Sequence, residues 1–204
     1  MDHRKKSRRR GEALCRAIFQ ATFDELAAVG YTGSSMERIA ERAHTSKASL
    51  YRRWTSRAEL VADAIRHTIP DPDELPDTGD LREDVLALLR LIANLLAGPV
   101  GEAARGLIAE TLRDPELAQI ARTRILASRP ELMLQVLRRA AVRGEVRPEA
   151  LTPRVANVGP VLLRHHFLVH GAPIPDRTLT EIVDDVVLPL VRSRPEDGHV
   201  LPGA

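Results

Sequence analysis

The chain has 204 residues, of which 44% are hydrophobic and 28% charged, so it has enough apolar material for a folded core. Its single cysteine, Cys15, excludes an intrachain disulfide and a thiol-rich zinc site, and we expect it to be a buried packing residue. The N-terminus lacks the apolar run of a signal peptide, and no apolar stretch of about 20 residues follows. These features predict a cytoplasmic protein that does not enter a membrane.

The charge is distributed unevenly along the chain. The net charge is only +2, yet residues 1–54 hold 12 of the 30 Lys and Arg residues and just 6 of the 28 Asp and Glu residues. The remainder carries an excess of acid. A basic front and a mildly acidic back indicate that the front meets a polyanion.

The first helices are marked by apolar spacing and by caps. A basic arm, residues 1–9, is expected to be disordered, and apolar residues then recur at helical spacing over 10–28. Gly30 suits the left-handed backbone that ends a helix. Ser34 has a glutamate three residues later, as a capping box requires, so it is favoured over Ser35 as the N-cap of a short helix over 36–43.

A third and a fourth helix follow after tight turns. His44-Thr45 makes the first turn, Ser46 caps a helix that runs through Trp54, and another helix is predicted over 57–69. Residues 70–80, "PDPDELPDTGD", contain three prolines and a glycine and therefore cannot continue a helix. We place a linker there.

The rest of the chain is also predicted to be helical. No run alternates with period two strongly enough to indicate a strand. Pro130 is expected to kink or break one helix, Pro160 and Pro189 are candidates for kinks in two others, and the tail from Ser193 is expected to be frayed. The predicted fold is all-α with about nine helices, the last five over 81–98, 102–113, 116–143, 152–169 and 177–192.

The segment "SKASLYRRW", residues 46–54, is typical of a helix that enters a DNA groove. Two short helices joined by a tight turn form a helix-turn-helix, whose second helix must offer donors to phosphates and side chains to base edges. Leu50 and Trp54 lie four residues apart and are expected to face inward, which leaves Tyr51, Arg52 and Arg53 outside. An ordinary solvated helix face is the alternative explanation for these charges. The candidate DNA-binding residues are Ser35, Thr45, Ser46, Lys47, Ala48, Ser49, Tyr51, Arg52, Arg53 and Arg57.

Residues 30–65 resemble the DNA-binding domain of the tetracycline-repressor (TetR) family of bacterial regulators. The resemblance rests on Gly30-Tyr31, Ile39-Ala40, Ser46-Lys47, Leu50-Tyr51 and Glu59-Leu60. With the helix before them, "AIFQATFDELAAVG", it covers about 55 residues closely, and beyond residue 70 it consists of helix count, spacing and the "RGEVRPE" turn.

The chain also departs from the family pattern. The family usually has glycine in the turn and again early in the recognition helix, where this chain has His44 and Ala48. His44 is therefore expected to adopt a left-handed backbone, which histidine tolerates better than most residues. The usual "Tyr-x-His-Phe" is here Tyr-Arg-Arg-Trp, and Arg57 stands where the family has lysine. Arg53 in place of the histidine points to a different operator.

The resemblance implies a domain organisation and a partner. Residues 1–69 would form the arm and the DNA-binding head, with the motif over about 34–54 and a connecting helix over 57–69, and residues 81–204 would form a regulatory domain. Family members are homodimers, which here would pair through 152–169 and 177–192. Such a dimer binds a nearly palindromic operator on double-stranded DNA, with half-sites about 34–36 Å apart. A small-molecule inducer would shift the connecting helix and weaken DNA binding.

Polar residues inside apolar runs are the candidates for contacts with an inducer, whose identity the sequence does not give. They are Asn94, Glu110, His165 and His166. For Asn94 an internal hydrogen bond is an equal alternative, and for Glu110 an internal ion pair is the stronger one. His166 and His170 share a helix face but lack a third ligand, so we predict neither a metal site nor a cofactor.

Two other classes of function remain as alternatives. An enzyme is disfavoured because the sequence has no nucleophile elbow, zinc-binding helix motif or phosphate-binding glycine loop. A constitutive or architectural DNA-binding protein, which would respond to no inducer, fits the basic head equally well.

Overall fold

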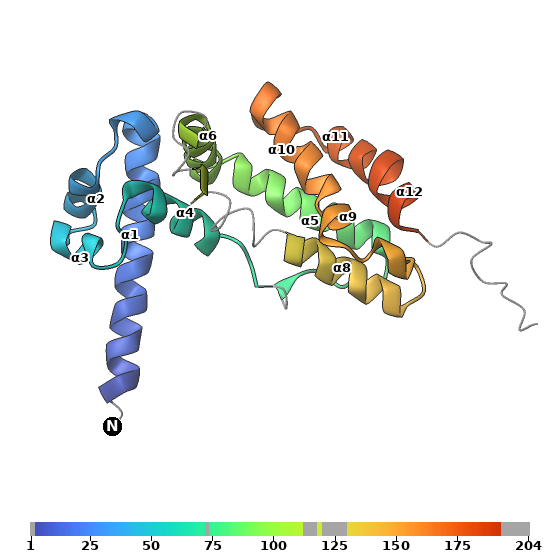
Figure 1. Ribbon diagram of the computed structural model, residues 1–204, viewed down its shortest axis with the longest axis horizontal. Helices are drawn as coiled ribbons and strands as arrows, with labels where there is room; N and C mark the ends of the chain where they lie inside the picture. The colour runs from blue at the N-terminus through green and yellow to red at the C-terminus, as the bar shows by residue number, and fades with distance from the viewer. Residues whose placement is uncertain (1–2, 72–73, 112–117, 120–129, 193–204) are drawn as a thin grey trace, which may run out of the picture. The chain divides into compact units, whose positions relative to one another are not determined.

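The protein is helical in the ranges described by the computed structural model, which are residues 3–71, 74–111, 118–119 and 130–192. Within these ranges the only extended pairing is an isolated antiparallel bridge between Val146 and Arg192. When α9 and α10 are counted as one helix, and α11, η4 and α12 as another, the described ranges hold nine helices (Figure 1). The predicted all-α fold is confirmed. The predicted tail from Ser193 and much of the predicted helix over 116–143 lie outside these ranges.

The contacts divide the chain into two units. The first contains α1 to α4 together with α6, and the second contains α5 and α8 to α12. No single helix in the described ranges is long and apolar enough to cross a membrane, although α5 and α6 pass that test when taken together across their break.

Helix α1 (His3–Gly33) is longer than predicted at its N-terminal end. Residues from His3 onward are helical, where the sequence suggested a disordered arm, because lysine and arginine are good helix formers and no proline interrupts them. At Gly30 the backbone leaves the helical region, with φ 70° and ψ 177°. The predicted stop at Gly30 is therefore confirmed as a break in the helix.

Helices α2 (Met36–Arg42), α3 (Lys47–Tyr51) and α4 (Arg57–His67) complete the head. The N-cap of α2 is Ser35, whose hydroxyl accepts a hydrogen bond from the Arg38 amide, so the prediction of Ser34 was wrong. The Ser34 hydroxyl is buried and donates to the Tyr31 carbonyl oxygen at 2.8 Å, so Ser34 belongs to the turn after the Gly30 break, one residue before the cap.

Helix α6 (Pro99–Thr111) packs within the first unit, although the sequence placed every residue beyond 81 in one domain. Its Ala103, Ala104 and Leu107 belong to one apolar cluster with residues of α1 and α4. At Gly106 a Cβ atom would lie 2.5 Å from the Tyr31 Cβ, so glycine permits this close approach.

The second unit is built around α5 (Leu81–Leu96), which Asp80 caps. Helix α8 spans Pro130–Val142, and the kink or break predicted at Pro130 stays a prediction because residues 120–129 lie outside the described ranges. The helix predicted over 152–169 is divided at Asn157 into two pieces. The remaining elements are η3 (Pro148–Ala150), α9 (Pro153–Ala156), α10 (Val158–His170), α11 (Asp176–Glu181), the π-helical η4 (Ile182–Val187) and α12 (Leu188–Val191).

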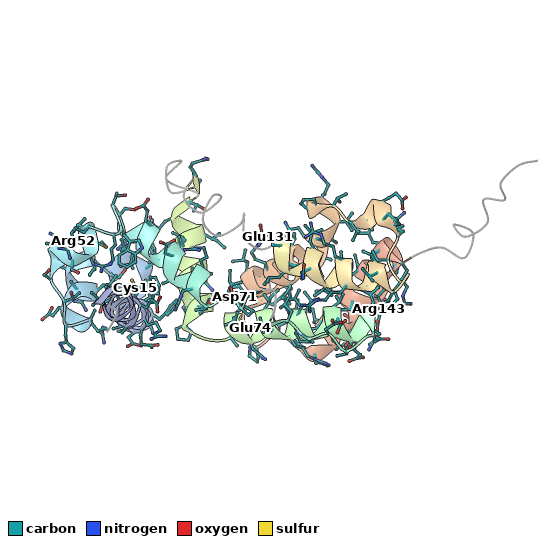
Figure 2. All side chains as sticks on the ribbon, turned by 90° about the horizontal axis from the view of Figure 1, so that it is seen from below. Cys15, Arg52, Asp71, Glu74, Glu131 and Arg143 are labelled. Carbon is teal, nitrogen blue, oxygen red and sulfur yellow. The ribbon has the colours of Figure 1, made fainter. Side chains whose placement is uncertain are left out.

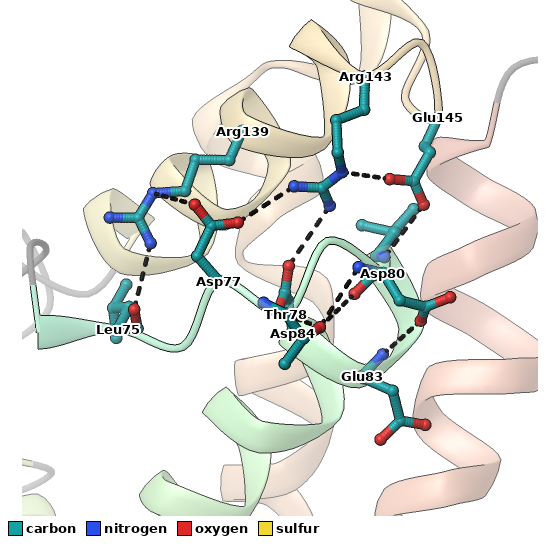
Figure 3. A network of polar contacts seen from close by, with 10 residues as sticks. Leu75, Asp77, Thr78, Asp80, Glu83, Asp84, Arg139, Arg143 and Glu145 are labelled. Carbon is teal, nitrogen blue, oxygen red and sulfur yellow. Dashed lines mark hydrogen bonds and ion pairs between the residues drawn. The ribbon is translucent and has the colours of Figure 1, made fainter.

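The linker before α5 is fixed to the second unit by a polar network (Figure 3). Buried Asp84 accepts hydrogen bonds from the amide and hydroxyl of Thr78, at 2.7 and 2.8 Å. Arg143, at the end of α8, donates to Asp84, Asp77 and Glu145 at 3.4, 3.2 and 2.6 Å. These contacts hold residues 77–84 against α8, so the linker is ordered at its second half.

Candidate nucleic-acid interface

Helix α3 is held in place by two side chains that point into the head. Leu50 is fully buried, and Trp54, four residues later, is 3% exposed. Both belong to an apolar cluster with Ile18 of α1 and Ile39 of α2. The Trp54 indole N–H also donates to Asp63 of α4 at 3.0 Å, so the anchor is both apolar and polar. The predicted inward orientation of Leu50 and Trp54 is confirmed.

The N-terminal end of α3 is capped as the sequence predicts. The Ser46 hydroxyl accepts a hydrogen bond from the Ser49 amide at 3.1 Å. Around this end Ser46, Lys47 and Ala48 are exposed, and Thr45 is half-buried. The first turn of α3 is therefore open to an anion such as a phosphate.

The C-terminal end of α3 comes earlier than predicted. The helix ends at Tyr51, which is 45% exposed, so Arg52 and Arg53 lie in the turn that follows (Figure 2 labels Arg52). Arg53 folds back and donates to the carbonyl and hydroxyl oxygens of Ser49, at 3.1 and 3.2 Å. Ser49 is only 6% exposed, so it supports Arg53 and presents little surface of its own.

Lys47 is exposed but already has partners. Its ammonium group forms an ion pair with Glu37 of α2 and lies 5.5 Å from the centre of the Tyr51 ring. The hydrogen bond with Glu37 raises the pKa of Lys47 and lowers that of Glu37. Both side chains are more than half exposed, so a phosphate can replace Glu37 at little cost.

Arg57 connects the first turn of α4 with the residues before α2. Its guanidinium group stacks on the Tyr31 ring, 4.2 Å from the ring centre, and donates to the Ser34 carbonyl oxygen. The side chain is half-buried in this position. Arg57 therefore has a packing role in this structure. A contact with a DNA phosphate would have to use the N–H groups of its guanidinium that do not bond Ser34.

The turn between α2 and α3 has the backbone that the sequence predicts. His44 has φ 49°, and no other described residue apart from glycine has a positive φ. The His44 and Thr45 amides donate to the carbonyl oxygens of Glu41 and Ala40, at 3.0 and 2.9 Å, which closes the turn. The expectation of a left-handed His44 is confirmed.

Glu25 of α1 was missed in the sequence, although it ties α1 to α2. Its carboxylate is only 2% exposed and accepts hydrogen bonds from Arg38 and from Arg42, the latter at 3.2 and 2.9 Å. Burial raises the pKa of Glu25, but the bonds from the two arginines outweigh burial and lower it overall. The sequence did offer one sign of this ion pair, since Glu25 is an acidic residue on the apolar side of a predicted helix.

The candidate contacts for an inducer lie on three helices, α5, α6 and α10. Asn94 is exposed in a shallow groove of about 510 Å³ on α5, whereas Glu110 is half-buried on α6 in the other unit. His165 is exposed, and His166 turns its ring toward His170, with 4.6 Å between the ring centres. Among the described residues no group of three or more His, Cys, Asp or Glu side chains is arranged to hold a metal ion.

The second unit exposes apolar side chains on α10 and η4. These helices lie side by side (Figure 1), and Val169 is the most exposed member of the set, at 60%. Phe167, Val183 and Val187, which lie in the two segments expected to form the subunit interface, are buried within the unit itself. The exposed apolar set is Val161, Leu162, Leu168, Val169 and Val186.

Comparisons with known proteins match both units. The profile of "Bacterial regulatory proteins, tetR family" matches residues 18–64, and that of "Tetracyclin repressor-like, C-terminal domain" matches residues 75–186. A helix-turn-helix-type transcriptional regulator of Mycobacterium tuberculosis is 33% identical over 165 residues, which cover 80% of this chain and 81% of the relative. The "DNA-binding transcriptional repressor TetR" of Mycobacteroides abscessus is 31% identical over 184 residues, 90% and 96% of the two chains.

Solved structures share the fold. A TetR family transcription regulator superimposes with a TM-score of 0.72 and 28% identity, over 85% of this chain and 96% of the other. A TetR transcriptional regulator from Agrobacterium tumefaciens gives a TM-score of 0.66 over 87% and 93% of the two chains, at 19% identity.

Proposed function

Since the chain belongs to the TetR family of helix-turn-helix transcriptional regulators, we propose that it is a repressor that binds a palindromic operator as a homodimer and is released by a small molecule. The observation that carries the proposal is the exposure of Tyr51, Arg52 and Arg53 at the end of a short helix whose other face is anchored by buried side chains.

The proposed division of labour follows from the geometry of α3. Its open first turn, with Ser46 and Lys47, would bind phosphates, and Thr45 and Ser35 would flank them. Arg52 and Tyr51 would read base edges, since no described residue holds the Arg52 guanidinium. Arginine at this place favours guanine, which offers two acceptors in the major groove.

The exposed apolar set on α10 and η4 supports the homodimer. Monomeric proteins seldom expose contiguous apolar patches unless these serve contacts. A two-fold axis through this surface would pair each unit with its copy and set the two α3 helices on half-sites about one DNA turn apart.

A constitutive DNA-binding protein is the second candidate, because the family and the exposed residues of α3 account for DNA binding without any inducer. A small molecule that abolishes operator binding would exclude it.

Selection of bound duplexes from a random DNA pool, at near-physiological salt, tests the proposal directly. We expect an enriched near-palindrome with half-sites about one helical turn apart. The Arg52→Ala variant should then lose discrimination at one base position by about 1–3 kcal/mol, measured on matched and mismatched duplexes. If no sequence is enriched and DNA binding disappears as the salt concentration rises, the head binds DNA only through non-specific electrostatic attraction.

A further inference from the structure

The head contains a groove of about 700 Å³ behind the recognition helix, bounded by α1, by the residues that follow α3, and by α4. Its floor is aromatic. The Phe19 ring lies between the rings of Trp54 and His67, with centre-to-centre distances of 5.6 and 5.0 Å. Cys15, labelled in Figure 2, also lines the groove. The Phe19 ring is inclined to these rings by 60° and 45°, so a planar ligand ring can pack on one of them and meet another edge to face.

The edge of the groove carries positive charge that lacks a compensating carboxylate. Arg16 is exposed and makes no hydrogen bond or ion pair in the described part of the chain. Arg53 also lines the groove, and its hydrogen bonds go to the neutral oxygens of Ser49.

The two carboxylates that line the groove are already engaged. Asp63 accepts the Trp54 indole N–H at 3.0 Å and lies 3.6 Å from the Arg66 guanidinium. Glu12 also has a polar interaction of its own. The free charges at the groove are therefore guanidinium groups, which prefer planar carboxylates.

We propose that this groove binds a planar aromatic carboxylate, with its ring against Phe19 and Trp54 and its carboxylate at Arg16 and Arg53. The inference goes beyond operator binding, since it assigns a ligand site to the DNA-binding head itself.

Such a ligand would act on the recognition helix through Trp54. The Trp54 amide donates to the Leu50 carbonyl oxygen of α3 at 2.9 Å, while its indole is bonded to α4. A ring that presses on the indole displaces the end of α3 relative to α4. Arg53, moreover, cannot hold the ligand and a phosphate at once. Ligand and DNA should therefore weaken each other's binding by the same factor.

The experiment uses the single tryptophan of the chain as its reporter. In the full-length protein without DNA, Trp54 gives one indole N–H signal in a nitrogen–proton correlation spectrum. Naphthalene-2-carboxylate is titrated as the probe, with naphthalene-2-methanol as its neutral match. We expect the carboxylate to shift the signal saturably and to bind about tenfold more tightly than the alcohol, as one charge-assisted contact supplies.

The Arg16→Gln variant distinguishes binding at the groove from non-specific binding of the probe. Arg16 is exposed, so we expect the variant to fold and to bind the carboxylate about three- to tenfold more weakly, with the alcohol unaffected. Arg138→Gln, an exposed arginine on α8, is the matched control and should change neither affinity. An unmoved indole signal, equal affinity for the two probes, or no effect of Arg16→Gln would each overturn the proposal. A signal moved by random-sequence duplex and not by the carboxylate would assign these arginines to DNA alone. None of these outcomes alters the result of operator selection.

Discussion

The surface around α3 and the surface of α10 and η4 are built in different ways. Around α3, neighbours in sequence fix one another, since Ser46 caps the helix, Leu50 and Trp54 anchor it, and Ser49 holds Arg53. On α10 and η4, five large apolar side chains are exposed among polar ones such as His165 and Asp185. A surface that is fixed by short-range contacts is complete within one chain, whereas an apolar surface of this kind requires a second body to cover it.

The largest expected effect is on stability, and it tests whether the buried face of α3 anchors the helix while the exposed face does not. Leu50→Ala should lower the free energy of unfolding by about 2–5 kcal/mol, because it leaves a cavity where a fully buried side chain packs. Tyr51→Ala, one residue along, is the matched control and should change stability by less than about 0.5 kcal/mol while it weakens DNA binding. Urea denaturation followed by circular dichroism measures both. Similar losses in the two variants would mean that the two faces of α3 are not distinct.

The second prediction concerns the apolar surface of the second unit. Val169→Asp places a charge in the proposed subunit interface and should weaken dimerisation by roughly 2–3 kcal/mol, about a hundredfold. Val142→Asp is the control, since Val142 on α8 is 90% exposed and lies outside this set. Analytical ultracentrifugation over a dilution series would give both dissociation constants. If Val142→Asp alone dissociated the protein, the interface would have to be moved to α8.

A region was predictable from the sequence when its contacts join residues that are close together in the chain. The cap at Ser46 and the anchors four residues apart depend on residues within one or two turns, and cap chemistry and periodicity detect such patterns. The left-handed His44 was expected from the resemblance, because the family has glycine at that position. Ser34 was preferred over Ser35 because the cap rule depends on residue types, whereas the extended backbone of Ser35, at φ −145° and ψ 161°, decides which hydroxyl reaches the first turn of α2.

Contacts between distant segments were not predictable in this way. Nothing in the sequence near Glu25 shows that Arg38 and Arg42 reach it, because these residues lie 13 and 17 positions away. The grouping of α6 with the head depends likewise on the approach of Gly106 to Tyr31. The four residues suggested as inducer contacts remain a prediction, since a polar residue in an apolar run signals no particular partner.

Glu25 provides the third prediction, because it is a long-range tie in the region that is otherwise locally determined. Glu25→Gln should destabilise the protein by about 1–3 kcal/mol at neutral pH, since it leaves two arginines without their carboxylate. The folded-state pKa of Glu25 lies below its ordinary value of 4.5, so the carboxylate stabilises the fold above that pH. This contribution is lost as the pH falls through the folded-state pKa.

The stability difference between wild type and Glu25→Gln should accordingly be constant from about pH 7 to pH 5 and shrink below about pH 4. Urea denaturation at each pH measures it. Asp24→Asn is the control, as exposed Asp24 accepts only a hydrogen bond from Gln20 at 2.9 Å, and it should show little change at any of these values. A difference that persisted undiminished in acid would contradict the role of the charge.

The smallest expected effect lies in the turn, where local geometry alone decides the outcome. A left-handed backbone costs a residue with a Cβ about 1–2 kcal/mol, and glycine avoids that cost but loses more entropy on folding. His44→Gly should therefore stabilise the protein by about 0.5–1 kcal/mol, because His44 has φ 49°. Ala43→Gly, at the neighbouring residue with φ −79°, should instead destabilise it by up to about 1 kcal/mol. Thermal unfolding measures both changes in stability. Changes of opposite sign in the two variants would show that the backbone of His44 determines the turn. A loss of stability in both would indicate that the imidazole side chain stabilises the turn.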